Sequence, residues 1–319
     1  MTQKATVIGA GVMGHGIAQV FALAGISVHL YDLNMKILTN AVASINNNLE
    51  LYLTNQIISS AEKEQVLKRI HTSTNLEESL VGSTFVIEAI PEVLQLKWDL
   101  YRSLEAICNQ NVIIASNTST IPLSTLIEHS IYPERFIIAH FLNPAPLVPL
   151  VEVIKHDCTS EHVIDTTMSL LKNAGKSPIL LKKEIQGFVV NRIQAALLRE
   201  VLSLIENDIV DVEDMDRIIK DGPGFRWAFI GPVEMIDYGG LDTWKRIFDN
   251  LFPNLNNRQT APEFINRFVA QNQLGAKTGE GIYPYSNICI DSLLTDRDNN
   301  FLSLIKIKNN MDFIKKPSY

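Results

Sequence analysis

Apolar and polar positions alternate along the first 185 residues in a rhythm typical of an open α/β sheet. Short apolar runs, each long enough for one buried strand, are separated by segments with apolar residues at helical spacing. The runs lie at residues 5–8, 26–31, 84–89, 112–116, 136–140, 150–154 and 178–181. Strands of a parallel sheet read as continuous apolar runs because helices cover both faces. We therefore expect a mostly parallel sheet with helices on both sides.

The pattern changes near residue 186. Helical spacing continues through residues 188–207 and 212–220 with no further strand signal. A chain of 319 residues exceeds the usual size of one hydrophobic core, so two domains are expected. We predict an α/β domain over residues 1–186 and a helical domain over 187–290. The polar extension over 291–319 is expected to form a short helix or a loose tail.

A helical excursion at residues 35–69 follows the second strand. We expect it to break at the asparagines of residues 46–48 and again at the serines of residues 59–60. Ile45, Leu49 and Tyr52 recur at helical spacing, which indicates a helix pair packed on itself. The alternative is that this excursion also lines a substrate cleft.

The stretch from Ala5 to Asp32 reads strand, glycine turn, helix, strand and acid. Gly9 permits a tight turn, Gly11 keeps side-chain atoms away from a pyrophosphate, and Gly14 lets the helix lie close to the strand. The helix N-terminus then faces the phosphates. Asp32, at the end of the second strand, accepts ribose hydroxyls and repels a 2′-phosphate. The pattern predicts a Rossmann-like domain that binds NAD rather than NADP, through Gly9, Gly11, Val12, Met13, Gly14 and Asp32.

Charge and composition disfavour nucleic acid, a membrane and a metal ion as partners. The formal net charge is −7, which disfavours nucleic acid because phosphate-backbone binding needs clustered Lys and Arg. No apolar run approaches the about 20 residues of a membrane span. The first strand follows Met1 too closely for a targeting peptide, so we expect a cytoplasmic protein. Cys108, Cys158 and Cys289 are not at metal-ligand spacing, so we predict reduced cysteines and no metal.

Four polar residues stand where strands or helices end, beside the expected nicotinamide position: Ser119, His140, Glu152 and Asn191. Ligands of open α/β sheets bind outside the carboxyl ends of the strands. His140 ends an apolar strand and is suited to take a proton from an alcohol. Glu152 lies in the apolar run Leu150 to Ile154, where a charge without a partner is costly. A His140–Glu152 pair removes that cost and stabilises the imidazolium that forms.

Each of these residues also has a structural interpretation. His140 alone is typical of a hydrogen-bonded structural histidine, and the acid in the apolar run is what favours catalysis. Ser119 could contact a substrate oxygen or cap the helix after Pro122. Asn191, at the start of the second domain's first helix, could stabilise an oxyanion or form a helix–helix hydrogen bond.

The motifs together resemble the L-3-hydroxyacyl-CoA dehydrogenase family over residues 1 to about 285. The resemblance is carried by VIGAGVMGHGIAQ, EAIPE, SNTST, AHFLNP, LVEVI, GFVVNR, IGPVEMIDYGGLD and LGAKTGEGIYPY. It implies a Rossmann-like domain followed by a helical domain that forms a homodimer. It implies His140 as the catalytic base, Glu152 as its paired acid, and Ser119 and Asn191 as substrate contacts. It also implies cofactor contacts at Asp32, Ala89, Glu92, Lys97 and Asn143.

Two departures from the family pattern concern the substrate. The acyl-CoA enzymes carry a lysine-rich excursion suited to CoA phosphates, whereas residues 35–69 hold only Lys36, Lys63, Lys68 and Arg69. The stretch at residues 222–232 resembles relatives that act on gulonate or carnitine, and Arg226 could clamp a carboxylate. We expect NAD-dependent oxidation of a short L-3-hydroxyacyl-CoA, as in fatty acid metabolism. The alternatives are a free 3-hydroxy acid as substrate, or an NAD-binding protein without catalysis.

Overall fold

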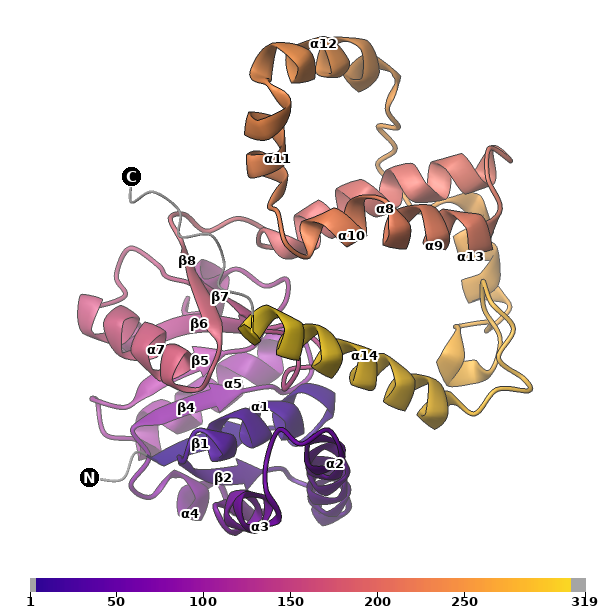
Figure 1. Cartoon of the computed structure of the whole chain (residues 1–319). Coiled ribbons are helices and arrows are strands. Elements are labelled where there is room, and N and C mark those ends of the chain that lie inside the picture. The colour runs from indigo at the N-terminus through magenta and orange to yellow at the C-terminus, as the bar shows by residue number, and fades with distance from the viewer. Residues whose placement is uncertain (1–3, 311–319) are drawn as a thin grey trace. The chain divides into compact units, whose positions relative to one another are not determined.

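The computed structural model describes residues 4–310, and residues 4–189 follow the predicted alternation of strands and helices (Figure 1). The strands are β1 (Lys4–Ile8), β2 (Ser27–Tyr31), β3 (Ile70–Ser73), β4 (Phe85–Glu88), β5 (Ile113–Ser116), β6 (Phe136–Phe141), β7 (Leu150–Ile154) and β8 (Ser177–Leu181). Within the described residues they form one sheet in the order β3-β2-β1-β4-β5-β6-β7-β8. The strands from β3 to β6 are parallel, and the pair β7–β8 runs antiparallel to β6.

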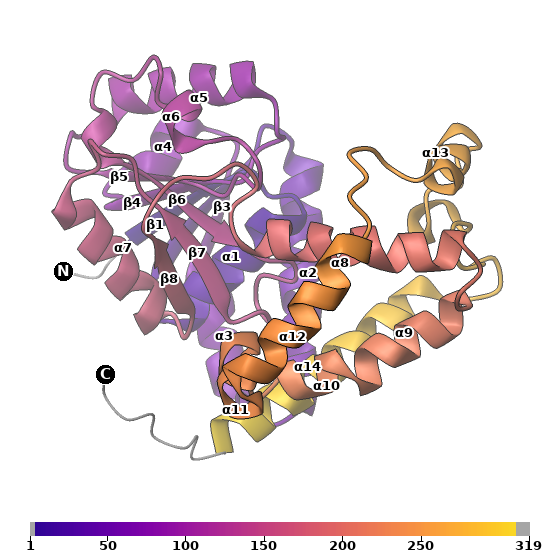
Figure 2. The same ribbon diagram turned by 90° about the horizontal axis from the view of Figure 1, so that it is seen from above.

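Helices cover both faces of this sheet (Figures 1 and 2). They are α1 (Val12–Leu23), α2 (Met35–Thr54), α3 (Ser60–Lys68), α4 (Leu76–Leu80), α5 (Leu94–Ile107), α6 (Leu123–Leu126), the 3₁₀ turn η1 (Pro133–Arg135) and α7 (Glu161–Asn173). Val7 packs in the apolar layer with α1, α2 and α7, whereas its neighbour Ile8 packs with α4, α5 and α6. Successive side chains of a strand point to opposite faces, so both faces are buried and the predicted parallel sheet is confirmed.

The predicted break at residues 46–48 is wrong, because α2 is continuous from Met35 to Thr54. Its apolar stripe is fully buried at Leu38, Ala41, Ile45 and Leu49. The Asn48 side chain donates to Gln19 Oε1 of α1 at 2.8 Å. Tertiary packing therefore outweighs the low helix propensity of the asparagines. The second predicted break is confirmed, and Ser59 forms a capping box with Glu62 at the start of α3.

The sequence pattern did not predict β3 or α4. The four residues of β3 are Ile70, His71, Thr72 and Ser73, and all are at least partly exposed at the edge of the sheet. An edge strand needs no continuous apolar run because only part of its surface is covered. Pairing with β2 fixes it instead.

A second compact unit comprises Val190–Leu293 and is helical. Its elements are α8 (Val190–Glu206), α9 (Val212–Asp221), α10 (Pro223–Trp227), α11 (Pro232–Gly239), α12 (Leu241–Leu251), η2 (Phe252–Asn254), α13 (Glu263–Ala270) and η3 (Ala276–Thr278). Arg258 pairs with Glu206, and the backbone N–H of Asn256 donates to Glu200 Oε2 at 2.8 Å. Because all its elements are α-helices or 3₁₀ turns, this unit confirms the predicted helical fold class of the C-terminal domain.

The C-terminal extension contains a helix of 21 residues, α14 (Ile290–Asn310). This is longer than the short helix or loose tail expected from its polar composition, and residues 311–319 lie outside the described part. From Leu294 on, α14 belongs to the same compact unit as the sheet. Leu302 is 1% exposed, and Ile305 packs against the same apolar cluster, so the apolar side chains at these two positions attach the helix to this unit. No described helix is long and apolar enough to cross a membrane.

Candidate active site

The glycine turn between β1 and α1 is shaped by contacts that exclude side chains. Gly9 has a φ of +94° and lies against the backbone of Ala89, whose oxygen would be 2.7 Å from a Cβ atom at position 9. A Cβ atom at position 14 would lie 1.7 Å from the Gly9 oxygen. No atom lies within 4 Å of a Cβ atom at position 11 among the described residues. The turn therefore leaves open space at the N-terminus of α1, which fits a cofactor pyrophosphate.

Asp32 is fixed beside this turn. Its Oδ2 accepts the Ala10 N–H at 2.9 Å, and its Oδ1 accepts the Asn34 N–H at 3.1 Å. The carboxylate is only partly buried. It is therefore oriented by the backbone and still reachable by a ribose, as a dinucleotide site requires. Val12 is exposed and Met13 partly exposed in the first turn of α1.

His140 and Glu152 form the predicted pair. They are directly opposite one another in the antiparallel register of β6 and β7. His140 Nδ1 lies 2.9 Å from Glu152 Oε2, and the two side chains are 5% and 2% exposed. Because Nδ1 is bonded to the carboxylate, Nε2 is the ring nitrogen suited to exchange a proton with a substrate.

A turn at residues 187–189 contacts both members of this pair. Phe188 is fully buried, and its ring centroid lies 5.3 Å from that of His140. The Val189 N–H donates to Glu152 Oε1 at 2.9 Å. Phe188 has a φ of +52°, a left-handed conformation that is strained for a bulky side chain. The contacts with His140 and Glu152 are available to stabilise this conformation.

A second buried ionic cluster lies at the carboxyl end of β4. Glu88 is 0% exposed, and it accepts hydrogen bonds from Lys97 Nζ at 2.8 and 2.9 Å. The Tyr101 hydroxyl donates to Glu88 Oε1 at 2.9 Å, and Ser116 Oγ donates to the same oxygen. Burial, and then the charge of Glu88, raises the pKa of Tyr101 well above its ordinary value. The cluster thus satisfies a carboxylate that burial would otherwise penalise.

Lys97 joins this cluster to the loop that carries Ser119. Its ammonium also lies 3.2 Å from Glu92 Oε2. Glu92 Oε1 accepts hydrogen bonds from the Thr118 hydroxyl and from the Ser119 N–H, the latter at 2.9 Å. Burial would raise the pKa of Glu92, but the hydrogen bond from Thr118 and the charge of Lys97 outweigh it and lower the pKa. Glu92 is therefore an anchor for the loop.

The remaining predicted residues differ in their surroundings. The helix after Pro122 has Pro122 at its N-cap position, so Ser119 is not its cap. Asn143 is exposed on the loop between β6 and β7. Lys97 is 1% exposed and held by Glu88 and Glu92, so any effect of Lys97 on a cofactor would pass through Glu92. Asn191, in the first turn of α8, and Arg226, in α10, belong to the second unit.

The sequence did not reveal three groups that contact the predicted site residues: Glu88, Phe188 and the Val189 N–H. A signal existed for Glu88, because it ends the apolar run of β4 just as Glu152 interrupts that of β7. Lys97 follows nine positions later as its partner. Nothing in the sequence indicated that Phe188 adopts a left-handed conformation, since that depends on its contacts in the fold.

Comparison with known proteins supports one family over most of the chain. The model of the 3-hydroxyacyl-CoA dehydrogenase NAD binding domain matches residues 4–185, and that of the 3-hydroxyacyl-CoA dehydrogenase C-terminal domain matches residues 187–285. The mitochondrial hydroxyacyl-coenzyme A dehydrogenase of Sus scrofa is 36% identical over 293 residues, which are 89% of this chain and 92% of the relative.

A second relative has a different name. The 5-formyl-3-hydroxy-2-methylpyridine 4-carboxylate 5-dehydrogenase of Mesorhizobium japonicum is 31% identical over 96% of this chain and 98% of its own length. A crystal structure of a dehydrogenase for this pyridine acid, described as an NAD+ dependent dismutase, is 30% identical with a TM-score of 0.91, covering 98% of this chain and 100% of that one. These matches confirm the predicted cofactor and enzyme class. The chain belongs to the 3-hydroxyacyl-CoA dehydrogenase family of NAD-dependent oxidoreductases.

Proposed function

We propose that the protein oxidises a secondary alcohol whose hydroxyl lies β to a carbonyl group, reversibly, with His140 as the base. The observation that carries this proposal is the buried hydrogen bond of 2.9 Å between His140 Nδ1 and Glu152 Oε2. A buried carboxylate beside an imidazole fixes the ring and stabilises the imidazolium formed when a proton arrives. A protein that only bound a nucleotide would not need this pair.

Each residue has one role in this proposal. His140 takes the hydroxyl proton on Nε2 while Glu152 holds the ring. Ser119 and Asn191 contact the reacting oxygen and stabilise charge that develops there. The open glycine turn and Asp32 hold the dinucleotide, with Ala89, Glu92, Lys97 and Asn143 as further cofactor contacts, direct or through neighbouring side chains. NAD, when bound, supplies the redox chemistry by accepting the hydride.

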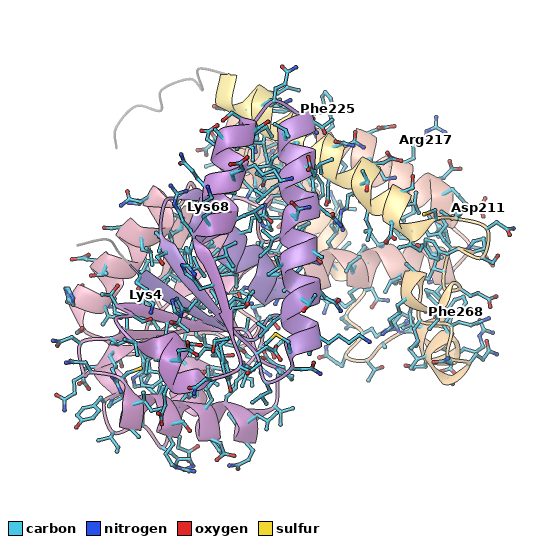
Figure 3. All side chains as sticks on the ribbon, turned by 90° about the horizontal axis from the view of Figure 1, so that it is seen from below. Lys4, Lys68, Asp211, Arg217, Phe225 and Phe268 are labelled. Carbon is cyan, nitrogen blue, oxygen red and sulfur yellow. The ribbon has the colours of Figure 1, made fainter. Side chains whose placement is uncertain are left out.

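The charges of the α2–α3 excursion favour a free hydroxy acid as the substrate. Lys63 pairs with Glu50, and Lys68, labelled in Figure 3, lies 4.0 Å from Glu64. Arg69 Nη1 donates to the Ala22 carbonyl at 3.2 Å. Two of the four cations in residues 35–69 therefore lie beside a carboxylate, which reduces the positive charge available to the phosphates of CoA.

Arg226 is the residue proposed to bind the carboxylate of such an acid. It is an exposed residue of α10, and a guanidinium binds a carboxylate in a bidentate manner. The relative matched over 96% of this chain is named for a pyridine carboxylate, which supports an acid. The second candidate is a short 3-hydroxyacyl-CoA, supported by the name of the mitochondrial relative.

A matched pair of substrates separates these candidates. We would follow NADH absorbance with 3-hydroxybutyrate and 3-hydroxybutyryl-CoA, and then with gulonate and carnitine. A higher kcat/KM for free acids supports the proposal, and a higher value for the thioester supports the second candidate. No turnover with any of them, while NAD still raises the melting temperature, would favour a non-catalytic binding protein.

The variant Arg226→Ala tests the carboxylate contact. Because hydrogen bonds to charged groups are worth about 1.5–3 kcal/mol, KM for a free acid should rise about 10- to 100-fold. KM for a thioester should hardly change. Arg217→Ala is the matched control, since Arg217 is a 77% exposed arginine on α9 of the same unit (Figure 3). An equal change for acid and thioester would contradict the role of Arg226.

We also propose that the helical unit forms a homodimer. Large apolar side chains of this unit are exposed, including Phe225 at 67%, Val233 at 73% and Leu241 at 66% (Figure 3 labels Phe225). Exposed apolar surface of this kind marks an interaction site. Analytical ultracentrifugation should show a dimer at micromolar concentration, and Val233→Lys with Leu241→Lys should shift the protein to monomer.

A further inference from the structure

The loop at residues 142–149 connects the two strands of the His140–Glu152 pair. It begins after Phe141, the last residue of β6, and ends before Leu150, the first residue of β7. Asn143 is exposed on this loop, and it is one of the residues proposed to contact the cofactor. A displacement of the loop would therefore move Asn143 and would also shift the ends of the two strands that carry His140 and Glu152.

The inner side of this loop is held by α1 and by a lysine. A Cβ atom at Gly16 of α1 would lie 3.0 Å from Pro146 Cδ and 3.2 Å from Ala145 Cβ, so the loop and the helix are in close contact. Lys176 Nζ donates to the carbonyl oxygens of Ala145, Pro146 and Val148, at 2.6, 3.2 and 3.0 Å. The backbone carbonyls on this side are thus satisfied by one ammonium group.

The outer side is held by α2 and α14. The Tyr52 hydroxyl donates to the Pro146 carbonyl at 3.2 Å. Leu147, 5% exposed, packs in one apolar cluster with Tyr52 and with Leu302 of α14. Asn55 Nδ2 donates to Asn299 Oδ1 at 2.8 Å, which links the end of α2 to α14. Burial, and then the charge of Asp298, raises the pKa of Tyr52, so this hydroxyl stays protonated as a donor.

The helix α14 lies beyond residue 285, where the match to the family's C-terminal domain ends. We propose that α14 holds the loop at residues 142–149 in position. In this proposal Leu302 packs in the cluster with Leu147 and keeps the loop against α1. In this role Leu302 is a positioning residue that touches neither substrate nor cofactor. The proposal rests on the proposed function only where it assigns Asn143 to the cofactor and His140 to the reaction.

The test compares two positions of the same helix in the full-length protein. Leu302→Ala removes the buried contact, whereas Ile307→Ala changes an apolar residue that is 50% exposed. Tyr52→Phe removes only the hydroxyl that bonds to Pro146, which keeps the test possible if Leu302→Ala does not fold. NADH affinity is measured by fluorescence titration and kcat by NADH absorbance, at a temperature where circular dichroism shows each variant folded.

We expect the NADH dissociation constant to rise at least fivefold in Leu302→Ala and kcat to fall about 10-fold, because displacements near 1 Å cost up to about 100-fold in rate. Ile307→Ala should match the wild type. Tyr52→Phe should change the NADH dissociation constant and kcat in the same direction as Leu302→Ala, but less. Leu302→Met, which keeps an apolar side chain of similar size, should have values close to those of the wild type. A lower melting temperature with unchanged NADH affinity and kcat would overturn the proposal. The NADH titration needs no substrate. It therefore tests the role of α14 even if the wild type shows no turnover, a result that would contradict the proposed function and not this proposal.

Discussion

The backbone N–H of Val189 donates to Oε1 of Glu152 at 2.9 Å, while the other carboxylate oxygen of Glu152 bonds to His140 Nδ1. The carboxylate is therefore held from two directions, by a strand partner and by the turn that leads to α8. A carboxylate with both oxygens bonded has little freedom to rotate. It fixes the imidazole more firmly than a single hydrogen bond would, and this makes Glu152 the first residue to test.

Glu152→Gln should remove the charge while keeping the size of the side chain. We expect kcat to fall about 10³- to 10⁴-fold, because the neutral amide no longer stabilises the imidazolium and can hold the wrong tautomer. The NADH dissociation constant should stay within about twofold, since none of the proposed nucleotide contacts is removed. Steady-state kinetics and fluorescence titration measure the two quantities. Glu161→Gln, at a side chain that is 81% exposed, is the control, and a large loss of NADH binding would contradict the assigned role.

Phe188→Leu and Phe188→Ala test the turn that contacts the pair. Phe188 is fully buried beside His140, so truncation to Ala should cost about 3–5 kcal/mol of unfolding free energy. The leucine variant keeps apolar volume but loses the ring that flanks the imidazole. We expect its kcat to fall about 10- to 100-fold at a temperature where it is folded, since a misplaced base is slow. An unchanged kcat in Phe188→Leu would mean that the ring is needed only for packing.

The sequence predicted the parts of the site in which a residue conflicts with its local pattern. Three glycines next to an apolar strand and an acid inside the run of β7 are such conflicts, and both led to residues that the structure places close together. Those arguments need no knowledge of the fold beyond strand order. The period of the apolar positions also predicted a change from sheet to helix near residue 186, and in the structure β8 ends at Leu181 and α8 begins at Val190.

The errors occurred where contacts distant in sequence decide the outcome. The asparagines of α2 did not end the helix because Asn48 bonds to Gln19, 29 residues earlier. Leu302 of α14 packs in one cluster with Tyr52 and Leu147, which lie at least 155 positions earlier in the chain, whereas Leu293, Leu294, Phe301 and Ile307 of the same helix are exposed. The turn at Phe188 depends on His140 and Glu152 in the same way. Such features follow from packing, which local sequence does not encode.

The buried cluster at Glu88 gives a prediction about stability. Lys97→Met should leave the Glu88 carboxylate, 0% exposed, without its cation, and breaking a buried pair costs about 3–5 kcal/mol. The double variant Glu88→Gln with Lys97→Met removes both charges and should recover a large part of that loss. Urea unfolding of the two single variants and the double variant gives the coupling energy. Additive effects would show that the two side chains do not act as a pair.

Lys176 gives a prediction about pH. Burial lowers the pKa of Lys176 from 10.5 to about 8. At a pH between these two pKa values, the unfolded chain keeps a proton on Lys176 that the folded chain has released. The unfolded state then binds more protons, so the free energy of unfolding should rise with pH across this window. The rise is at most about 1.4 kcal/mol per pH unit. It should be seen as a difference between the wild type and Lys176→Met in urea unfolding at pH 7, 8, 9 and 10, because other titrating groups contribute equally to both. A difference that stays constant over this range would show that Lys176 keeps its proton in the folded protein, held by the carbonyls of Ala145, Pro146 and Val148.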